Sequence, residues 1–406
     1  MRQAGNDRYL SLECLETPAH EQNWREDWDA FVQQTGAEVY FLTGWQAAWW
    51  QHYGPDLSGS RKPVSYILRD GPQIIGILPF CIETVWAGIW PVRFARLAGV
   101  DPNFAVMTLP IVAGKEDAVL RSVTDHLTQQ MRCAAISLSP LSDRSPQLAS
   151  IRAMAANGAT ASVLRDRSDR GHTLMDLPDS RDGFMAALSK SRRREVRRDI
   201  KRLTQDAPLR NISSDPDTLD IMMDRFIELH TRQWQAVGKG GHFSDWWPAA
   251  AFYRTLLHRL APDNRAAIDE QWQGDTLLSS QLRYTLGDKA YWWLNARAID
   301  PRFEKVGLGR VGLVERVGDL IDAGIGLVEA GAGEYEYKLS YGGELVPVHA
   351  LVLAGRGPVA RLRVQALLLW ADAIHLFYYR LWFLKIRPRL GTRPRALWAI
   401  WIRTRL

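Results

Sequence analysis

The sequence predicts an α/β fold built from two similar halves and followed by a C-terminal amphipathic helical tail. Its 406 residues exceed the length of one typical domain. Helical and strand-like periodicities alternate along both halves, which is the pattern of mixed, mostly antiparallel sheets flanked by helices. The final stretch is rich in aromatic and basic residues and breaks this alternation. We therefore expect domains over residues 1–165 and 166–358, and a tail over 359–406.

The first half is predicted to mix helices and strands after a leader over residues 1–20. In its first helix Trp28 and Phe31 follow Trp24 at spacings of four and three, so the three lie on one face. Asp, Gly and Pro at positions 70–72 are a turn signal between two apolar strands. The expected elements are helices over 23–34, 44–52 and 116–130, and strands over 64–69, 73–82, 97–103, 105–110 and 134–138.

The second half repeats this order after a charged stretch over 166–182, which we expect to be a loop between the halves. Gly-Asp pairs at 274–275 and 287–288 mark two hairpin turns. Because both halves share the order, we predict two structural repeats. The expected elements are helices over 181–204, 215–234, 246–260 and 309–323, and strands over 266–271, 276–285, 289–296, 325–329 and 346–353.

The basic charge of the chain is concentrated in its tail. The net charge is +6, yet residues 360–406 hold ten Lys or Arg and a single acid, Asp372, so the rest of the chain carries −3. This distribution argues against nucleic-acid binding, which needs a basic face on the folded body. It favours an anionic membrane surface as a partner.

The apolar part of the tail is a poor membrane span. Residues 364–384 include Gln365, Asp372, His375 and Arg380, and such residues are costly inside a bilayer. Two interpretations stay open: a helix lying in the membrane interface, or one docked on the body or on a partner protein. The oligomeric state is not predicted.

Cysteine and histidine usage points to a reducing compartment without a metal site. The three cysteines are far apart and the nine histidines are scattered, with no spacing typical of disulfides or zinc ligands. The first twelve residues contain charges and no apolar run. We expect a cytoplasmic protein, peripheral at the inner face of the cytoplasmic membrane.

Three segments carry a resemblance to a known family. They are LSKSRRREVRRDIKRL (188–203), FIELHTRQW (226–234) and GAGEYEYKLSYGG (331–343). In order and spacing they resemble the CelD/BcsL group of GNAT-type acyltransferases, which is associated with bacterial cellulose and exopolysaccharide biosynthesis. That group is related to the Fem-type transferases, which carry two tandem GNAT folds. The resemblance spans roughly residues 20–355 and implies two tandem GNAT-like domains, the first one degenerate.

The loop before the helix over 309–323 is the predicted donor site. Gly307, Leu308 and Gly309 let the backbone approach a ligand, and the helix N-terminus favours a diphosphate. Lys305 and Arg310 flank the loop and are suited to phosphates. The resemblance implies an acyl-CoA, such as acetyl-CoA, as co-substrate. A tight strand–helix turn is the alternative interpretation.

Two further features bear on donor binding. Glu304 stands where many GNAT enzymes have Arg or Gln, a departure from the family pattern. The resemblance also implies that the strand over 289–296 splays from its neighbour and pairs with the pantetheine arm. Trp293 and Asn295 then face the cleft, unless the tryptophans of this strand belong to the core.

The predicted catalytic residues follow the donor loop, with one exception. The resemblance implies a Tyr337–Lys338 pair near the acceptor or the donor phosphate, and a lysine there can steady negative charge in a tetrahedral intermediate. Glu329 and Glu336 are possible general bases. His230 lies on a helix, where it serves either as a proton acceptor or as a hydrogen-bonded structural residue.

These features together predict an acyl-CoA-dependent N- or O-acyltransferase acting on a sugar, a polysaccharide precursor or a lipid-linked glycan. Direct transfer in a ternary complex is expected, since no Cys–His or Ser–His–Asp motif is visible. The basic helix over 190–202 is suited to a phosphate-bearing acceptor or a membrane surface, or is a solvated face. Two alternatives remain: a Fem-type aminoacyl transferase using charged tRNA, and a non-catalytic assembly factor of a membrane polysaccharide machine.

Overall fold

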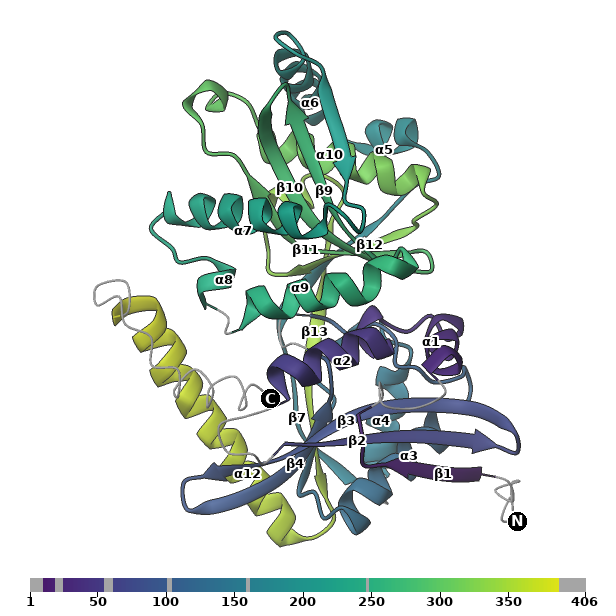
Figure 1. The fold of residues 1–406 in the computed structure, drawn as a ribbon. Helices are drawn as coiled ribbons and strands as arrows, with labels where there is room; N and C mark the ends of the chain where they lie inside the picture. The colour runs from purple at the N-terminus through teal and green to yellow at the C-terminus, as the bar shows by residue number, and fades with distance from the viewer. Residues whose placement is uncertain are drawn as a thin grey trace. The chain divides into compact units, whose positions relative to one another are not determined.

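The computed structural model divides the chain into two compact units (Figure 1). Unit 1 comprises residues 1–169 and 347–406, and unit 2 comprises residues 170–346. Residues 347–358, expected in the second domain, thus group with unit 1. The structure describes residues 10–18, 25–54, 61–100, 104–157, 161–245 and 248–386.

The sheet of unit 1 has the strand order β1-β2-β3-β4-β5-β13. Neighbouring strands are antiparallel except for β4 and β5, which run parallel. The short strand β6 also pairs with β13. Through its pairs with β5 and β6, β13 belongs to the sheet of the first unit. The strands are β1 (Leu10–Leu15), β2 (Lys62–Asp70), β3 (Gln73–Ala87), β4 (Trp90–Leu97), β5 (Ala135–Ser137), β6 (Leu141–Ser142) and β13 (Glu344–Gly355).

Helices cover this sheet and complete its core. The last of them, α12, buries Val364 and Leu367 against Val92 and Phe94 of the sheet, so the start of the tail is part of unit 1 (Figure 1). The helices are α1 (Arg25–Gln34), η2 (Val39–Phe41), α2 (Thr43–Tyr53), α3 (Glu116–Asp125), η3 (His126–Gln130), α4 (Gln147–Ala156), α12 (Pro358–Ile374) and η6 (His375–Ile386).

The sheet of unit 2 has the mirrored order β7-β12-β11-β10-β9-β8. Again one neighbouring pair, β11 and β12, is parallel and the others are antiparallel. The two units therefore repeat one topology: four antiparallel strands, a parallel step across a helix, and a final antiparallel strand. The strands are β7 (Ala161–Asp176), β8 (Leu209–Ser213), β9 (Ala266–Gln273), β10 (Thr276–Leu286), β11 (Lys289–Arg297) and β12 (Leu327–Ala332).

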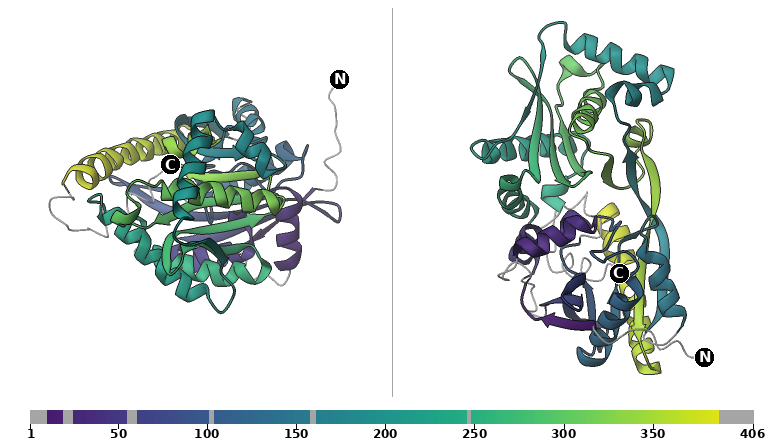
Figure 2. Two further views of the ribbon diagram at one scale, coloured as in Figure 1. Left: turned by 90° about the horizontal axis from the view of Figure 1, so that it is seen from above. Right: turned by 90° about the vertical axis from the view of Figure 1, so that its right-hand side faces the viewer.

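Helices lie on both faces of this second sheet. α7 packs on β9, β10 and β11 from one face, while α10 packs on β10 and β11 from the other and contacts α5 and α6 (Figure 2). The helices are α5 (Arg181–Ala187), α6 (Lys190–Leu203), α7 (Leu219–Gln235), α8 (His242–Asp245), α9 (Ala249–Leu260), η4 (Ala261–Asp263), η5 (Pro301–Phe303), α10 (Leu308–Asp322) and α11 (Glu336–Leu339). The predicted fold class, two α/β repeats with a helical tail, is confirmed.

Three local predictions are wrong. The strand pair over 97–103 and 105–110 does not form in the described residues of these ranges: β4 ends at Leu97, and Val106 forms an isolated bridge to Leu141. The loop expected over 166–182 is largely strand β7, whose charged residues form ion pairs, as Asp166 does with Arg152. The helix over 181–204 is broken, because extended Leu188 ends α5 and the Ser189 side chain caps α6.

Candidate functional site

The parallel strands of unit 2 pair over only three residues. The described β11–β12 pairs run from Lys289 with Leu327 to Tyr291 with Glu329. β11 then continues to Arg297, paired with β10 on its other side, while β12 next pairs at Ala332 with β7. Between the two strands this leaves a fork in which the backbone edge of β11 at 292–297 has no described strand partner. The splay expected for this strand is therefore present.

A buried polar cluster lies at the base of this fork. Glu329 is the last residue of β12 that pairs with β11, and it is fully buried. Its Oε1 lies 3.1 Å from Nδ1 of His172 on β7, which is also fully buried. The Gly331 backbone N–H donates to the same oxygen at 3.1 Å. Two partners thus hold the Glu329 carboxylate in one position.

Lys338 on α11 joins the cluster from the other side. Its side chain is 5% exposed, and its Nζ donates to the Ala330 carbonyl of β12. Burial lowers the pKa of Lys338 to about 8, against the opposing effect of the Glu329 charge. Lys338 is therefore an amine that gains or loses a proton close to neutral pH.

Aromatic side chains surround the lysine amine. Lys338 Nζ lies 4.9 Å from the ring centroid of Tyr335 and 6.0 Å from that of Tyr337. The Tyr337 hydroxyl in turn accepts a hydrogen bond from Asn295 Nδ2 of β11 at 3.3 Å. The structure thus brings together the predicted residues Glu329, Tyr337, Lys338 and Asn295. The side chain of Trp293 lies outside the part of the chain that the structure describes.

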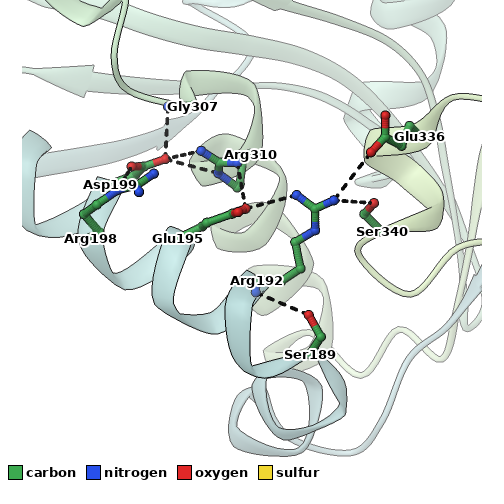
Figure 3. A network of polar contacts seen from close by, with 9 residues as sticks. All are labelled: Ser189, Arg192, Glu195, Arg198, Asp199, Gly307, Arg310, Glu336 and Ser340. Carbon is green, nitrogen blue, oxygen red and sulfur yellow. Dashed lines mark hydrogen bonds and ion pairs between the residues drawn. The ribbon is translucent and has the colours of Figure 1, made fainter.

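The predicted donor loop has a different environment. Gly307 caps α10, and its N–H donates to Oδ2 of Asp199 on α6 at 3.1 Å (Figure 3). Arg310 donates to the same carboxylate from Nε and Nη2 and to Glu195 from Nη1. Burial favours a raised pKa for Asp199, but hydrogen bonds from Arg310, Gly307 and Arg198 hold it below its usual value. The N-terminus of α10 therefore already faces an anion.

The other residues of the predicted donor loop point in different directions. Leu308 is buried in the core with Val311. Gly309 and Lys305 are exposed, and the Lys305 carbonyl accepts a hydrogen bond from Arg202 of α6 at 3.1 Å. In this structure the loop joins α10 to α6.

The two predicted bases lie in opposite environments. The side chain of Glu336 is 90% exposed and forms an ion pair with Arg192 at 3.5 Å. Glu329 is enclosed within the sheet. Of the two carboxylates, only that of Glu336 is open to solvent, whereas Glu329 is buried beside the buried Lys338.

His230 belongs to an aromatic cluster on α7 and α8. Its Nε2 accepts a hydrogen bond from the Trp234 indole at 3.0 Å, and the rings of Phe226 and Phe243 lie 5.9 Å and 5.2 Å away. Burial lowers the pKa of His230 to about 4. Of its two expected roles, the hydrogen-bonded structural one fits this neutral, enclosed ring better.

Two residues of the site were missed in the sequence. His172 lies in the segment expected to be a loop, but it belongs to β7, where residues 172–175 are all buried, and no alternation of polar and apolar residues marks this part of the strand in the sequence. Asp199 appears in the sequence as one of two acids, with Glu195, among the basic residues of 190–203. Its position three residues after Val196 and four before Leu203 places it on the buried face of α6, a signal that predicts a partner inside the fold.

The described residues show neither a metal-binding cluster nor a helix able to span a membrane. No group of three or more His, Cys, Asp or Glu side chains there is arranged to hold a metal ion. In the same part of the chain, none of the helices combines the length and apolarity needed to cross a bilayer.

Comparison with known proteins agrees with this geometry. Residues 190–339 match the family described as acetyltransferase (GNAT) domain. The crystal structure of FemX is similar with a TM-score of 0.60 and 12% identity, over 86% of this chain and 99% of that one. A conserved protein of unknown function from Bacteroides thetaiotaomicron VPI-5482 is similar with a TM-score of 0.52 and 11% identity, over 85% and 100% of the two chains.

These comparisons identify a domain type. No curated protein sequence matches this chain, and identities of 11–12% to solved structures show a shared fold alone. The family match, however, covers α6 through α11 and so includes the fork, Lys338 and the α10 N-terminus. Residues 190–339 thus form a GNAT-type acyltransferase domain.

Proposed function

We propose that unit 2 transfers an acyl group from an acyl-CoA, such as acetyl-CoA, to an amine or hydroxyl group of a sugar, a polysaccharide precursor or a lipid-linked glycan. The observation that carries this proposal is the fork between β11 and β12, with Lys338 at its base. A fork of this kind offers a free strand edge beside a titratable group, which is what a thioester donor and a nucleophilic acceptor require.

The donor's pantetheine arm fits the free edge of β11. Its two amides would pair with backbone N–H and C=O groups over residues 292–296, in the manner of an added strand. The N–H of the next residue, Arg297, already donates to Gln233 Oε1 at 2.8 Å. The pairing of the amides directs the thioester toward the base of the fork, past the hydrogen bond that joins Asn295 and Tyr337. The acyl group then lies beside the amine of Lys338.

Lys338 is the proposed catalytic residue. With a pKa of about 8, roughly a tenth of its amine is neutral at pH 7. The acceptor N–H or O–H group attacks the thioester carbonyl carbon, and neutral Lys338 takes the acceptor's proton. The tetrahedral intermediate then breaks its C–S bond, and the thiolate leaving group takes the proton from Lys338, which restores the neutral amine.

Glu329 and His172 are positioning residues in this scheme. Both are fully buried, so they act on the substrate only through Lys338. The Glu329 charge raises the pKa of Lys338, opposing burial, while His172 fixes the carboxylate. Together they set the pH at which the amine becomes a base.

A face of α6 supports a phosphate-bearing acceptor, such as a lipid-linked glycan. Lys190, Arg194, Arg197 and Lys201 follow one another at spacings of four, three and four, so they share one exposed face of the helix. No ion pair to any of the four is found among the described residues. Four such cations in a row are suited to the phosphates of an acceptor.

The exposed side of α12 and η6 supports attachment at the inner face of the cytoplasmic membrane. Leu362, Leu369, Leu376 and Phe377 are exposed large apolar side chains there, and they suit an interface position. Truncating the tail would remove core residues of unit 1, so flotation of Leu369→Glu and Phe377→Glu variants with anionic vesicles is the better test. Flotation equal to the wild type would remove the membrane proposal. The basic residues of the tail beyond residue 386 lie outside the described part of the chain.

The decisive experiment pairs calorimetry with a transfer assay. Acetyl-CoA, longer acyl-CoAs, free CoA and charged tRNA are titrated into the full chain, and product formation on amino-sugar and lipid-linked glycan acceptors is followed by mass spectrometry. Binding with transfer supports the proposal. Transfer only from charged tRNA would replace it with an aminoacyl transferase, and no binding of any donor would favour a non-catalytic assembly factor.

A further inference from the structure

The N-terminus of α10 is occupied by a carboxylate of the chain itself. Asp199 accepts hydrogen bonds from the Gly307 N–H, from Nε and Nη2 of Arg310 and, on its other oxygen, from Nε of Arg198 at 3.1 Å (Figure 3). These are the donors that a bound diphosphate would need: a backbone N–H at a helix start and guanidinium groups beside it. Both oxygens of Asp199 are thus engaged where a ligand's phosphate would be expected.

The arginines that contact this carboxylate and its neighbour Glu195 are balanced by carboxylates. Figure 3 contains three arginines, and each contacts a carboxylate: Arg198 and Arg310 contact Asp199, and Arg192 contacts Glu195 and Glu336. Three carboxylates therefore balance three guanidinium groups. A diphosphate at this point would add negative charge to a network that is already neutral.

The carboxylate is also difficult to displace. The Asp199 side chain is fully buried on the inner face of α6, so it has no route to water without a shift of the helix. Moving it would leave Arg310 without its closest partner, and separating a buried, hydrogen-bonded charge pair is strongly unfavourable. The contact of Asp199 with Arg310 and Gly307 therefore keeps a ligand anion away from the α10 N-terminus.

We propose that Asp199 permanently takes the place of the donor's diphosphate, so that unit 2 selects its donor through the thioester and the pantetheine arm and not through the diphosphate. Asp199 is then a specificity-determining residue. For the identity of the donor this inference rests on the proposed acyl transfer. Its central claim, that the α10 N-terminus does not accept a diphosphate, is tested without any donor.

The first test uses the wild-type protein and two thioesters. Acetyl-CoA and S-acetylpantetheine, which lacks the diphosphate, are compared as donors. We expect values of kcat/KM within about threefold of each other. A diphosphate bound through charge-assisted hydrogen bonds would give acetyl-CoA an advantage of roughly tenfold or more, and that result, lost again in Arg310→Met, would overturn the inference.

The second test is independent of catalysis. ADP, which carries a diphosphate and no thioester, is titrated calorimetrically into the wild type, Asp199→Asn and Glu195→Gln. We expect no binding to the wild type and a gain of binding in Asp199→Asn, because neutralising that residue frees the charge of Arg310. Glu195→Gln is the matched control: it also neutralises a partner of Arg310 but leaves Asp199 over Gly307, and it should not bind ADP.

The outcomes separate the two proposals. ADP binding to the wild type, or none to an Asp199→Asn variant whose circular dichroism matches the wild type, contradicts the role of Asp199. If that variant does not fold, the wild-type titration and the two-thioester comparison still decide. If neither thioester supports transfer, the acyl-CoA proposal fails, while the ADP titrations still give an answer for Asp199.

Discussion

The two units build the same fork and use it differently. In unit 1, β4 and β5 run parallel and are joined through α3, as β11 and β12 are joined through α10. In unit 1, however, Val106 pairs with Leu141 in the segment that follows β5. It lies on the same side of that segment as β4 lies of β5. Its N–H donates to the Pro140 carbonyl at 2.9 Å, and its carbonyl accepts from Ser142 at 2.8 Å. The first fork is thus filled by its own backbone, and the second is not.

The side chains at the two forks also differ, being aromatic in unit 1 and charged or titratable in unit 2. In unit 1, the buried ring of Phe104 stacks on Tyr40 and meets Trp45 edge-on, and Gln46 is held by the carbonyls of Tyr40 and Ala98. In unit 2, the base of the fork holds a lysine, a carboxylate and a histidine. One scaffold thus holds aromatic side chains at one fork and a buried lysine, carboxylate and histidine at the other, and this difference supports unit 2 as the place of the proposed chemistry.

The largest expected effect is on the rate of transfer in Lys338→Met. Loss of a positioned acid–base group costs about 10²–10⁴-fold, so kcat should fall within this range while donor binding persists. Lys305→Met, which removes an exposed lysine of the same domain, is the control and should stay within about threefold. A Lys338→Met enzyme with a wild-type rate would place the chemistry elsewhere.

The same variant should be more stable than the wild type at neutral pH. The pKa of Lys338 falls from 10.5 to about 8 on folding, so below pH 8 the folded state carries a buried charge at a cost of about 3 kcal/mol. Methionine removes this cost but also the hydrogen bond to Ala330, worth about 1 kcal/mol. Wild-type stability should rise between pH 8 and 10.5, where the unfolded chain binds the extra proton. Urea unfolding of both proteins at pH 7 and 10.5 would measure this, and an unchanged difference between the two pH values would contradict it.

Phe104→Ala tests the other side of the comparison. Removing a buried aromatic side chain costs about 3–5 kcal/mol, so the free energy of unfolding should fall by this amount in denaturant titrations. Because the first fork is a core and not a site, kcat of the folded variant should change by less than about threefold. A variant that keeps its stability but loses transfer would make unit 1 part of the active site.

The strands and the helix that form the second fork were easier to predict from the sequence than the side chains buried inside it. Strands β9 to β11 were predicted to within a few residues, because Gly274 and Gly287 stand at turns with φ of +56° and +59°, a conformation that glycine adopts at little cost. Helix α10 was predicted because apolar residues recur along it at helical spacing. Periodicity therefore sufficed wherever one face of an element is buried.

Burial of charge could not be predicted in the same way. The segment containing Glu336 and Lys338 reads as one exposed charged loop, yet the first side chain is exposed and the second buried. The difference arises because Lys338 meets the Ala330 carbonyl on β12, a tertiary contact with no local signature. The filling of the first fork by Val106 was missed for the same reason, and residues 105–110 were read as a strand.

Glu329→Gln should have an intermediate effect and a specific signature. The Glu329 charge raises the pKa of Lys338, so its removal should lower that pKa and shift the rise of kcat/KM to a lower pH. We also expect roughly a tenfold loss at the new optimum, since the amide replaces the carboxylate that His172 contacts at 3.1 Å. A pH–rate profile measures both. Glu336→Gln, an exposed carboxylate on the helix of Lys338, should leave the profile in place, and a shift in that control would show that the effect is not specific to the buried carboxylate.

Tyr337→Phe should give the smallest effect and locates the mouth of the fork. It removes only the hydroxyl that accepts from Asn295 at 3.3 Å and keeps the ring beside Lys338. A single exposed neutral hydrogen bond is worth about 0.5–1 kcal/mol, so KM for the acyl donor should rise about two- to fivefold with kcat nearly constant. Asn295→Ala should give the same change, and the double variant no more, because both lose one bond. Additive losses would mean that each side chain contacts the donor by itself. The hydrogen bond between Asn295 and Tyr337 would then not be what the donor depends on.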